Sequence, residues 1–511
     1  MKTDPTIDTN TPALQALDDA LAQGDLREVR RQLAALDDNE RATLRLELGD
    51  AAYDQVYRSV RRATAGRSLG KVIVLHGIMG GRLAVRRKGD TDNVWINYWR
   101  LATGRMAQLE LDAQGEPRDP GVEVLVKGHI RKYYLPMVLR LDQRWDVKPF
   151  AYDWRKDIRE SAVRLADTIR TFAGDEPVHL VAHSMGGLVA RYMMHLFPEL
   201  WQGMADGDGL ARGGRLVMLG TPNHGSYSIP VAMTGADRQL RLLAKLDLAH
   251  GLDDIVRITN SFAGSYQMLP SPLTSNGDHR NRLYTQDTWG KHPVHQHLLR
   301  RGRQFHDEIA DAVDPDRFVY VAGYNRDTPH RVHVDSPGKF RYQLTRNGDG
   351  RVPHELGLLD GVPTWWVNAT HGDLARNGDV LAAIDDLLQT GKTSVLRPLR
   401  PASRTAQDTR LHSPDDFEAL DPAIIELLSE ETRSARPRAT RLSGEAQLQV
   451  ENALASSAIG GGADAAQAMI ATPASGVSRP KPAMRVEVVW GDITEAEGDV
   501  FTVGHYQGVL P

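Results

Sequence analysis

The stretch Val178–Phe197 reads VHLVAHSMGGLVARYMMHLF, and the turn at its centre indicates the fold. An apolar run typical of a buried strand ends at Ser184, two glycines follow within three residues, and a helical pattern begins. Such a turn exposes the serine oxygen and aims the helix N-terminus at a reacting carbonyl. It needs small residues two positions before and after the serine, where Ala182 and Gly186 stand. We predict that Ser184 is a nucleophile; the alternative is a serine that only caps the helix.

Similar apolar runs recur along the chain, separated by amphipathic helical patterns. Strands that are buried on both faces and alternate with helices are typical of a mainly parallel sheet wrapped in helices. The expected strands are residues 71–77, 145–153, 177–184, 215–222, 317–324 and 364–370. The predicted fold class is therefore α/β.

Four regions are expected along the chain. They are a helical N-terminal region at 1–66, an α/β domain at 67–395, a helix with a flexible linker at 396–483, and the start of a further β-containing module at 484–511. Residues 227–315 exceed a simple crossover, which predicts a lid over the carboxyl edge of the sheet. The helix of the third region is expected at 413–434. Because the last segment ends in a strand pattern, we expect a longer protein with a fused or partner module at this end.

The composition excludes several classes of protein. A formal charge of −4 over 511 residues, without a long basic block, argues against nucleic-acid binding. The chain has no cysteine, so disulfides, thiolate metal sites and cysteine nucleophiles are excluded. The N-terminal segment lacks the apolar core of a signal peptide, and no apolar run approaches the roughly 20 residues that span a bilayer. We expect a cytoplasmic protein without metal or cofactor, and leave a peripheral membrane contact open.

A serine nucleophile needs donors that receive the negative charge developing on the substrate carbonyl oxygen. One donor is the backbone N–H of the residue after the serine, here Met185. The second comes from a loop after an earlier strand, and the glycine-rich HGIMGG at 76–81 follows the first strong strand. We assign the second donor to the backbone N–H of Ile78.

The acid and the base are expected after the nucleophile in chain order. Asp349 lies in a glycine-flanked turn after a strand, and His371 lies between an apolar strand and a helix. An imidazole there can take the serine proton while a buried carboxylate orients its other nitrogen. Asp373 and Asp379 are rivals for the acid, although Asp373 is expected to cap the following helix, and His354 is a rival for the base.

Further residues are expected around the substrate. Gly77, Met79, His183 and Tyr227 are the substrate-binding candidates. The insertion also offers an acyl groove or a membrane contact, unless its apolar residues form the core of the lid. Those residues are Ile229, Val231, Met233, Leu240, Leu242 and Leu243.

Several motifs occur in one order across residues 70–385. They are HGIMGG (76–81), YDWR (152–155), HSMGGLVAR (183–191), GTPNHGS (220–226), SFAGSYQMLPSP (261–272) and GDGRVP (348–353). Their order resembles the lecithin:cholesterol acyltransferase-like branch of the α/β-hydrolases, which includes phospholipases and acyltransferases. The resemblance implies the same triad and the same oxyanion pair, and it implies a structural ion pair between Asp153 and Arg155. The chain departs from that pattern at His76, where those lipid enzymes often have proline.

The expected function is hydrolysis of an ester bond by a lipase, phospholipase or acyltransferase, through an acyl-enzyme intermediate on Ser184. Two alternatives stay open at this point. One is a hydrolase-fold effector or regulatory module of a larger bacterial protein, latent until a partner activates it. The other is a peptidase or thioesterase, since the same triad serves amides and thioesters.

Overall fold

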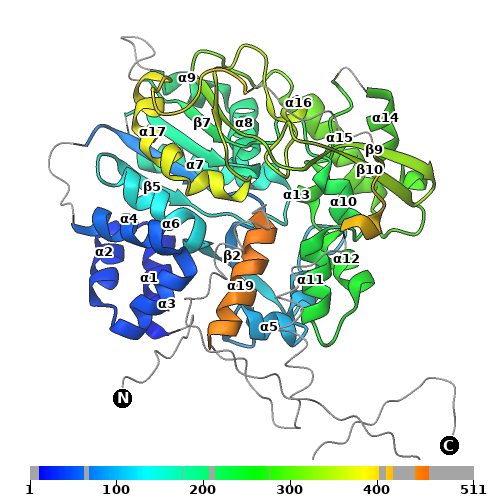
Figure 1. The fold of residues 1–511 in the computed structure, drawn as a ribbon, viewed down its shortest axis with the longest axis horizontal. Helices are drawn as coiled ribbons and strands as arrows, with labels where there is room; N and C mark the ends of the chain where they lie inside the picture. The colour runs from blue at the N-terminus through cyan, green and yellow to red at the C-terminus, as the bar shows by residue number, and fades with distance from the viewer. Residues whose placement is uncertain are drawn as a thin grey trace, which may run out of the picture. The chain divides into compact units, whose positions relative to one another are not determined.

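A six-stranded parallel sheet forms the centre of the protein (Figure 1). The computed structural model describes residues 11–61, 68–174, 176–205, 213–274, 277–401, 410–417 and 444–459. The strand order is β11-β8-β7-β6-β1-β5, and every neighbouring pair is parallel. The strands are β1 (Lys71–Leu75), β5 (Asp146–Phe150), β6 (Val178–His183), β7 (Leu216–Leu219), β8 (Phe318–Gly323) and β11 (Thr364–Val367). All six lie within the predicted strands, and the predicted α/β-hydrolase fold is confirmed.

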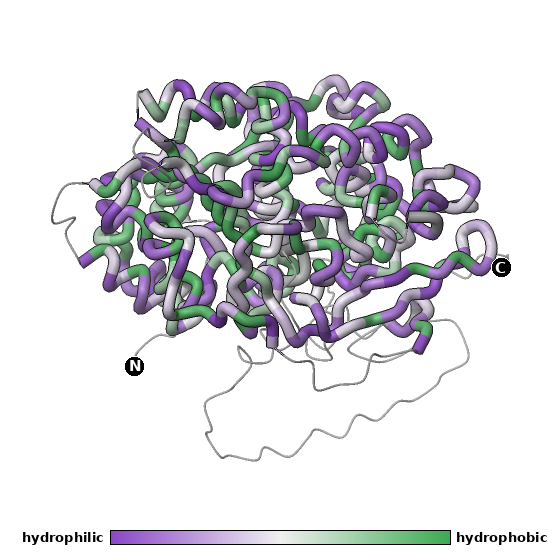
Figure 2. The backbone as a smooth tube through the Cα atoms, turned by 90° about the horizontal axis from the view of Figure 1, so that it is seen from above, coloured by the Kyte–Doolittle hydropathy of each residue, from purple (hydrophilic) through white to green (hydrophobic). Residues whose placement is uncertain are grey.

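The strand before Ser184 lies inside this sheet. Each of the six residues of β6 is buried, because β1 and β7 pair with it on either side and helices cover the sheet. Figure 2 shows hydrophobic residues along the central segments, whereas hydrophilic residues are frequent on the outer turns. The site at the end of β6 is therefore built on the most buried strand pairings of the fold.

Helices flank the sheet, and polar residues fix where several of them begin. Asp157 caps α7 by accepting the N–H of Arg159, and Asn377 caps α17. α7 packs against α8, and α6 packs against α17 and β5. These helices are α6 (Arg131–Leu141), α7 (Ile158–Ala173), α8 (Met185–Leu196), α9 (Pro198–Gly203) and α17 (Gly378–Thr390), with the short α16 (His354–Gly357) and η4 (Gly372–Ala375) nearby in the chain.

The N-terminal region is helical, as predicted, and it packs on the α/β domain. α1 contacts β4, and α4 contacts α6. The buried guanidinium of Arg131 pairs with Asp18 and Glu47 at 2.7 Å each, which joins α6 to α1 and α3. The elements are α1 (Pro12–Gln23), α2 (Leu26–Ala35), α3 (Asp38–Leu48), α4 (Asp50–Arg61) and β4 (Glu123–His129). Most leucines of this region belong to the main hydrophobic core, so it is an integral packing element.

Two small antiparallel sheets accompany the parallel one. The first has the order β3-β2-β4 and lies between β1 and β5 in the chain, a segment for which the sequence pattern gave no strand. The second is the β9-β10 hairpin, whose end leads into the loop of Asp349. The strands not yet given are β2 (Gly81–Arg87), β3 (Asp90–Trp95), β9 (Thr328–Ser336) and β10 (Lys339–Thr345). The short helices α5 (Tyr98–Ala102) and η1 (Arg105–Leu109) follow β3 in the chain.

The expected lid segment between β7 and β8 is helical in the described residues. It contains α10 (Ser228–Met233), α11 (Arg238–Leu246), α12 (Leu252–Thr259), α13 (Ala263–Tyr266), α14 (Gly277–Asn281), η2 (Arg282–Tyr284), η3 (Gln286–Trp289) and α15 (Gln296–Ile309). Residues of α10 and α11 border the pocket above Ser184, so the segment covers the carboxyl end of β6.

One helix near the C-terminal end of the described chain was not predicted as a separate element. α19 (Gly444–Ile459) contacts α3 and α5 on one side and α11 on the other, and Figure 1 shows it between the N-terminal helices and the lid. Leu448, Val450 and Leu454 are buried there. Of the helix expected at 413–434, the described part is η5 (Pro414–Phe417). The rest of that helix and the module expected at 484–511 lie outside the described residues.

Gly187, the second glycine after Ser184, gives a test of how closely α8 packs against Thr221 in the loop after β7. A Cβ added to Gly187 would come within 2.6 Å of Thr221 Cγ2 and 2.8 Å of Thr221 Cβ. Gly187→Ala should therefore lower the free energy of unfolding by about 1–3 kcal/mol, the usual cost of overpacking. Urea denaturation measures it, with Gly203→Ala as the matched control, because nothing lies within 4 Å of that position. A Gly187→Ala variant as stable as the control would contradict the close contact between α8 and Thr221.

Candidate active site

Ser184 stands on a strained turn between β6 and α8. Its φ of 53° and ψ of −125° fall where residues with a side chain are rarely found. A Cβ at Gly186 would lie 2.7 Å from the carbonyl oxygen of His76, so the position accepts no larger residue without a shift. The Ser184 side chain makes no capping hydrogen bond to α8. The helix-cap interpretation of this serine is therefore wrong.

Three side chains meet at this turn. His371 Nε2 lies 2.8 Å from Ser184 Oγ, and His371 Nδ1 lies 2.8 Å from Asp349 Oδ2. All three residues are buried, with 5% or less of their surface exposed. An ionised carboxylate only accepts, so Nδ1 carries the imidazole proton and Nε2 is free to accept the serine hydroxyl. This is the geometry in which an imidazole can remove the serine proton.

The surroundings keep Asp349 ionised. Burial alone would raise the pKa of this carboxyl, but His371 and the backbone N–H groups of Arg351 and Val352 outweigh burial and lower its pKa below the usual value. The two N–H groups donate to Oδ1 at 3.0 and 2.7 Å. His371 is also held by its own backbone N–H, which donates to the Asp349 carbonyl at 2.8 Å.

The rival acids and base lie elsewhere. Asp373 accepts from Thr370 Oγ1 at 2.6 Å and pairs with Arg376, while Asp379 is exposed. The expected helix-capping role of Asp373 is also wrong, because Asn377 accepts the first N–H groups of α17. His354 Nε2 lies 2.9 Å from the carbonyl oxygen of Gly323 and makes no contact with Ser184.

The two residues whose amides are expected to hold an oxyanion both lie near Ser184. Met185 is the first residue of α8, and Ile78 borders the same pocket as Ser184. Among the described residues, neither backbone N–H donates to another backbone group. Met79, the next residue of this loop, has a φ of 58° and is strained as Ser184 is.

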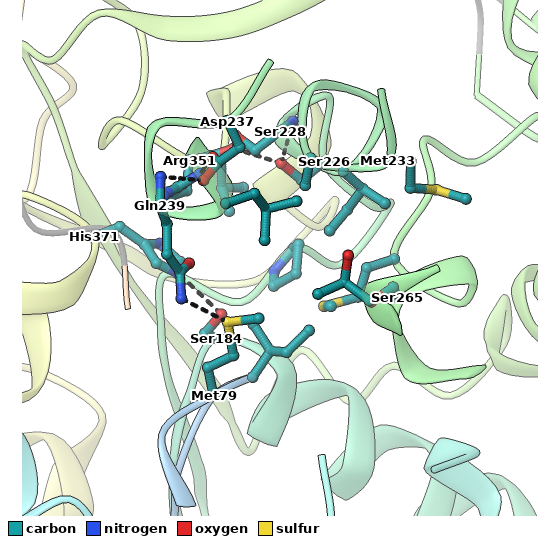
Figure 3. Close-up of a pocket in the computed structure, with 18 of the residues that line it drawn as sticks. Met79, Ser184, Ser226, Ser228, Met233, Asp237, Gln239, Ser265, Arg351 and His371 are labelled. Atoms are coloured by element: carbon teal, nitrogen blue, oxygen red, sulfur yellow. Dashed lines mark hydrogen bonds and ion pairs between the residues drawn. The ribbon is translucent and has the colours of Figure 1, made fainter. Parts of the chain in front are cut away.

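A pocket opens above Ser184 (Figure 3). Of the substrate-binding candidates, Met79 and His183 border it, and Gly77 lies against Ser184, since an added Cβ would be 2.8 Å from Ser184 Cβ. Tyr227 does not border the pocket, and its assignment as a substrate-binding residue is corrected. Its hydroxyl instead accepts from Arg280 Nε at 2.8 Å, inside the second hydrophobic cluster of the protein.

The lid supplies the apolar part of the pocket wall. Of the six apolar lid residues named from the sequence, Ile229, Met233 and Leu240 border the pocket. The other three, Val231, Leu242 and Leu243, are buried in the hydrophobic clusters. The sequence suggested either a groove or a lid core for these residues. Three of them line the pocket and the other three form core, so each interpretation holds for part of the segment.

Polar residues also line the pocket, and several of them come from the lid as well (Figure 3). Arg351 pairs with Asp237, and Gln239 Nε2 lies 3.1 Å from the sulfur of Met79. Ser226 and Ser228 both donate to the backbone carbonyl of Arg351, and so bind the lid entrance to the loop of Asp349. Sequence reasoning missed this contact, although the GTPNHGS and GDGRVP motifs carry both halves of it.

The YDWR motif is structural, as predicted. Arg155 is fully buried and pairs with Asp153 through two hydrogen bonds, at 2.9 Å from Nε and 2.6 Å from Nη2. Its Nη1 donates to the carbonyl of Leu109. No metal site competes with this arrangement within the described part of the chain, where no three acidic or histidine side chains cluster suitably. None of the described helices is long and apolar enough to cross a bilayer.

Comparison with known proteins identifies the family of this segment. Residues 141–301 match the family described as lecithin:cholesterol acyltransferase. This segment of the central domain is similar to the lecithin:cholesterol acyltransferase family. The matched segment includes the Ser184 turn and most of the lid, whereas Asp349 and His371 follow it in the chain. The resemblance that the motifs indicated is confirmed.

Two solved structures are similar over most of their own length. The mature form of Bacillus licheniformis lipase BlEst2 is 14% identical over 62% of this chain and 91% of that chain, with a TM-score of 0.28. A chain of the Tle4-Tli4 complex is 15% identical over 76% of this chain and 98% of that chain, with a TM-score of 0.32. A search of curated proteins found no match.

Buried imidazoles make the stability of this α/β-hydrolase pH-dependent. Burial lowers the pKa of four of them to between about 3 and about 4: His76, His179, His183 and His306. In the unfolded chain the pKa of each of these imidazoles returns to about 6.5. Below pH 6.5 the unfolded state binds more protons, so stability is full above that pH and falls as the pH drops toward 4. Each group contributes up to about 1.4 kcal/mol per pH unit.

Urea denaturation at several pH values between 7.5 and 4.5 measures this loss. His306→Gln should flatten the dependence, because the glutamine amide can still donate to the Leu269 carbonyl that His306 Nε2 contacts at 2.8 Å. His195→Gln, which removes an exposed imidazole, is the matched control. A free energy of unfolding that stays constant from pH 6.5 to 4.5 would contradict the buried neutral imidazoles.

Proposed function

We propose that this protein is a serine ester hydrolase of the lipase and phospholipase type. The observation that carries the proposal is the unbroken line of hydrogen bonds from Ser184 Oγ through His371 to Asp349. It ends at a pocket to which the lid contributes apolar side chains. The match to the lecithin:cholesterol acyltransferase family supports the same chemistry.

The mechanism follows from the roles of the three side chains. Ser184 Oγ attacks the carbonyl carbon of the ester while its proton moves to His371 Nε2. Asp349 stays ionised and stabilises the imidazolium through Nδ1. The carbonyl oxygen becomes an oxyanion, which the N–H groups of Ile78 and Met185 stabilise.

The intermediate then collapses, the carbon–oxygen bond to the leaving alcohol breaks, and His371 gives that alcohol its proton. This leaves an acyl group on Ser184. His371 next removes a proton from water or from a second alcohol, which attacks the acyl carbonyl and releases the acyl group. Hydrolysis and acyl transfer differ only in this second acceptor.

An acyl chain of some length fits the pocket better than a peptide or a small acyl group. Apolar side chains from the lid line part of the pocket wall, as in most pockets that bind apolar ligands. Ile229 and Met233 from α10 and Leu240 from α11 would contact the chain. The polar side chains of Arg351 and Asp237 would face the alcohol part of a lipid ester.

Ser184→Ala should reduce hydrolysis of a p-nitrophenyl ester to background. The removed hydroxyl forms the covalent bond, and no other group at the site replaces it. Turnover of a short and a long ester, together with labelling by a fluorophosphonate probe, measures the effect, and urea denaturation checks that the variant folds. Ser265→Ala is the matched control, since that serine borders the pocket without contacting His371. A Ser184→Ala variant that keeps its turnover would disprove the proposed nucleophile.

Ala232→Phe should shorten the accepted acyl chain. Ala232 borders the pocket from α10, so an aromatic ring there would fill space that a long chain needs. We expect at least about a tenfold loss of kcat/KM on a sixteen-carbon ester and little loss on a four-carbon ester, by the usual cost of misfit in an apolar pocket. Ala244→Phe on α11, equally half-buried but outside the pocket, is the control. Equal losses on both esters would place the acyl chain elsewhere.

A further inference from the structure

The peptide group between Gly77 and Ile78 is held at its carbonyl end by His76. His76 Nδ1 lies 2.7 Å from the Gly77 carbonyl oxygen, which also accepts the N–H of Gly80 at 3.1 Å. This is the peptide group whose N–H is assigned to the oxyanion in the proposed mechanism. The contact was not predicted from the sequence, where His76 stood out only as a departure from proline.

The protonation state of His76 follows from its second contact. The backbone N–H of Tyr152 donates to His76 Nε2 at 3.1 Å, so Nε2 carries no proton and Nδ1 carries it. Burial lowers the pKa of His76 to about 4, which keeps the ring neutral near pH 7. Nδ1 therefore donates to the Gly77 carbonyl, with no ambiguity of tautomer.

The ring itself is fixed on all sides. It stacks on Tyr152 with centroids 4.2 Å apart at 8°, and the edge of His129 packs against it at 5.0 Å and 85°. The Tyr152 hydroxyl donates to the backbone carbonyl of His76 at 2.7 Å. His76 has no exposed surface. A donor held this firmly can set the orientation of the group it contacts.

We propose that His76 is the positioning residue of the oxyanion hole, an inference that rests on the proposed function. In a planar trans peptide the carbonyl and the N–H point in opposite directions. Fixing the Gly77 carbonyl toward the His76 ring therefore fixes the Ile78 N–H toward the opposite side. Ile78 and Ser184 border the same pocket, and a Cβ on Gly77 would lie 3.3 Å from Ser184 Oγ. The preceding peptide is fixed too, because the Gly77 N–H donates to the Tyr134 hydroxyl at 3.0 Å. Without the His76 donor, the peptide group keeps only the Gly80 contact and can rotate.

The test removes the donor and keeps the ring. His76→Phe preserves stacking on Tyr152 but cannot donate, and His76→Asn restores a donor close to the Nδ1 position. We expect His76→Phe to lower kcat about tenfold to a hundredfold with KM nearly unchanged, below the loss of a whole oxyanion donor. His76→Asn should recover most of kcat. His129→Phe is the matched control, because His129 is buried beside His76 and contacts the Val74 carbonyl rather than the Gly77–Ile78 peptide.

A transition-state analogue separates positioning from a general packing defect. A trifluoromethyl ketone forms an oxyanion on Ser184, so His76→Phe should weaken its inhibition by the same factor as kcat. Binding of a fatty acid, the product, should not change. A folded His76→Phe variant with wild-type kcat, or one that loses KM and fatty-acid binding instead of kcat, would overturn the proposal.

Two measurements decide the proposal without catalysis. Crystal structures of the wild type and His76→Phe should show the Gly77–Ile78 peptide rotated only in the variant; an unrotated peptide overturns the inference. Nitrogen NMR of the wild-type protein should show a protonated Nδ1 and an unprotonated Nε2 at His76, and the opposite tautomer overturns it as well. If the wild type hydrolyses no ester, the proposed function fails, while these two measurements still decide the role of His76.

Discussion

The left-handed backbone at Ser184 is the constraint on which the site depends. Residues with a side chain adopt such a conformation at a cost of about 1–3 kcal/mol, so the surroundings must hold it. β6 supplies that support, because its six buried residues pair with β1 and β7 and the Ser184 N–H donates to the Leu219 carbonyl at 2.9 Å. The small residues after the serine let α8 approach the sheet closely enough to complete the turn. The central strands thus hold Ser184 in a strained conformation that places its hydroxyl at the pocket.

The motifs that are separate in sequence form one assembly around this turn. Ser226 and Ser228 bind the carbonyl of Arg351, whose own N–H donates to Asp349. A Cβ at Gly220 would lie 3.0 Å from both Asp349 Oδ2 and His371 Nδ1. The loop after β7 therefore packs directly against the acid and the base. A change in any one of these loops would therefore reach the acid and the base through these contacts.

The sequence predicted those parts of the protein whose signal is local. The six parallel strands appear as apolar runs, and Ser184, Asp349 and His371 each follow a strand at its carboxyl end. Contacts between distant segments left no local signal. Tyr134 lies on a helix and reaches Gly77 and His183 only because α6 packs beneath the loop, and no periodicity indicates that contact. Tyr227 was misassigned for the same reason: its nearness to the motif in sequence said nothing about the direction of its side chain, which contacts Arg280.

Two buried polar side chains beneath the site, those of Tyr134 and His183, are neutral. Their neutrality matters in the proposed mechanism because a positive charge forms on the imidazole of His371. The Tyr134 hydroxyl accepts the Gly77 N–H and donates to His183 Nδ1, and His183 Nε2 donates to the His371 carbonyl, each within 3.0 Å. This chain joins the oxyanion loop to the base without any charge, since burial lowers the pKa of His183 to about 3. The rings of His183 and His371 are 5.1 Å apart. A charged His183 would raise the energy of the imidazolium at His371 by about 3 kcal/mol at an effective dielectric constant of about 20. The burial of His183 that weakens the fold in acid thus also keeps a second positive charge away from the catalytic base of the proposed mechanism.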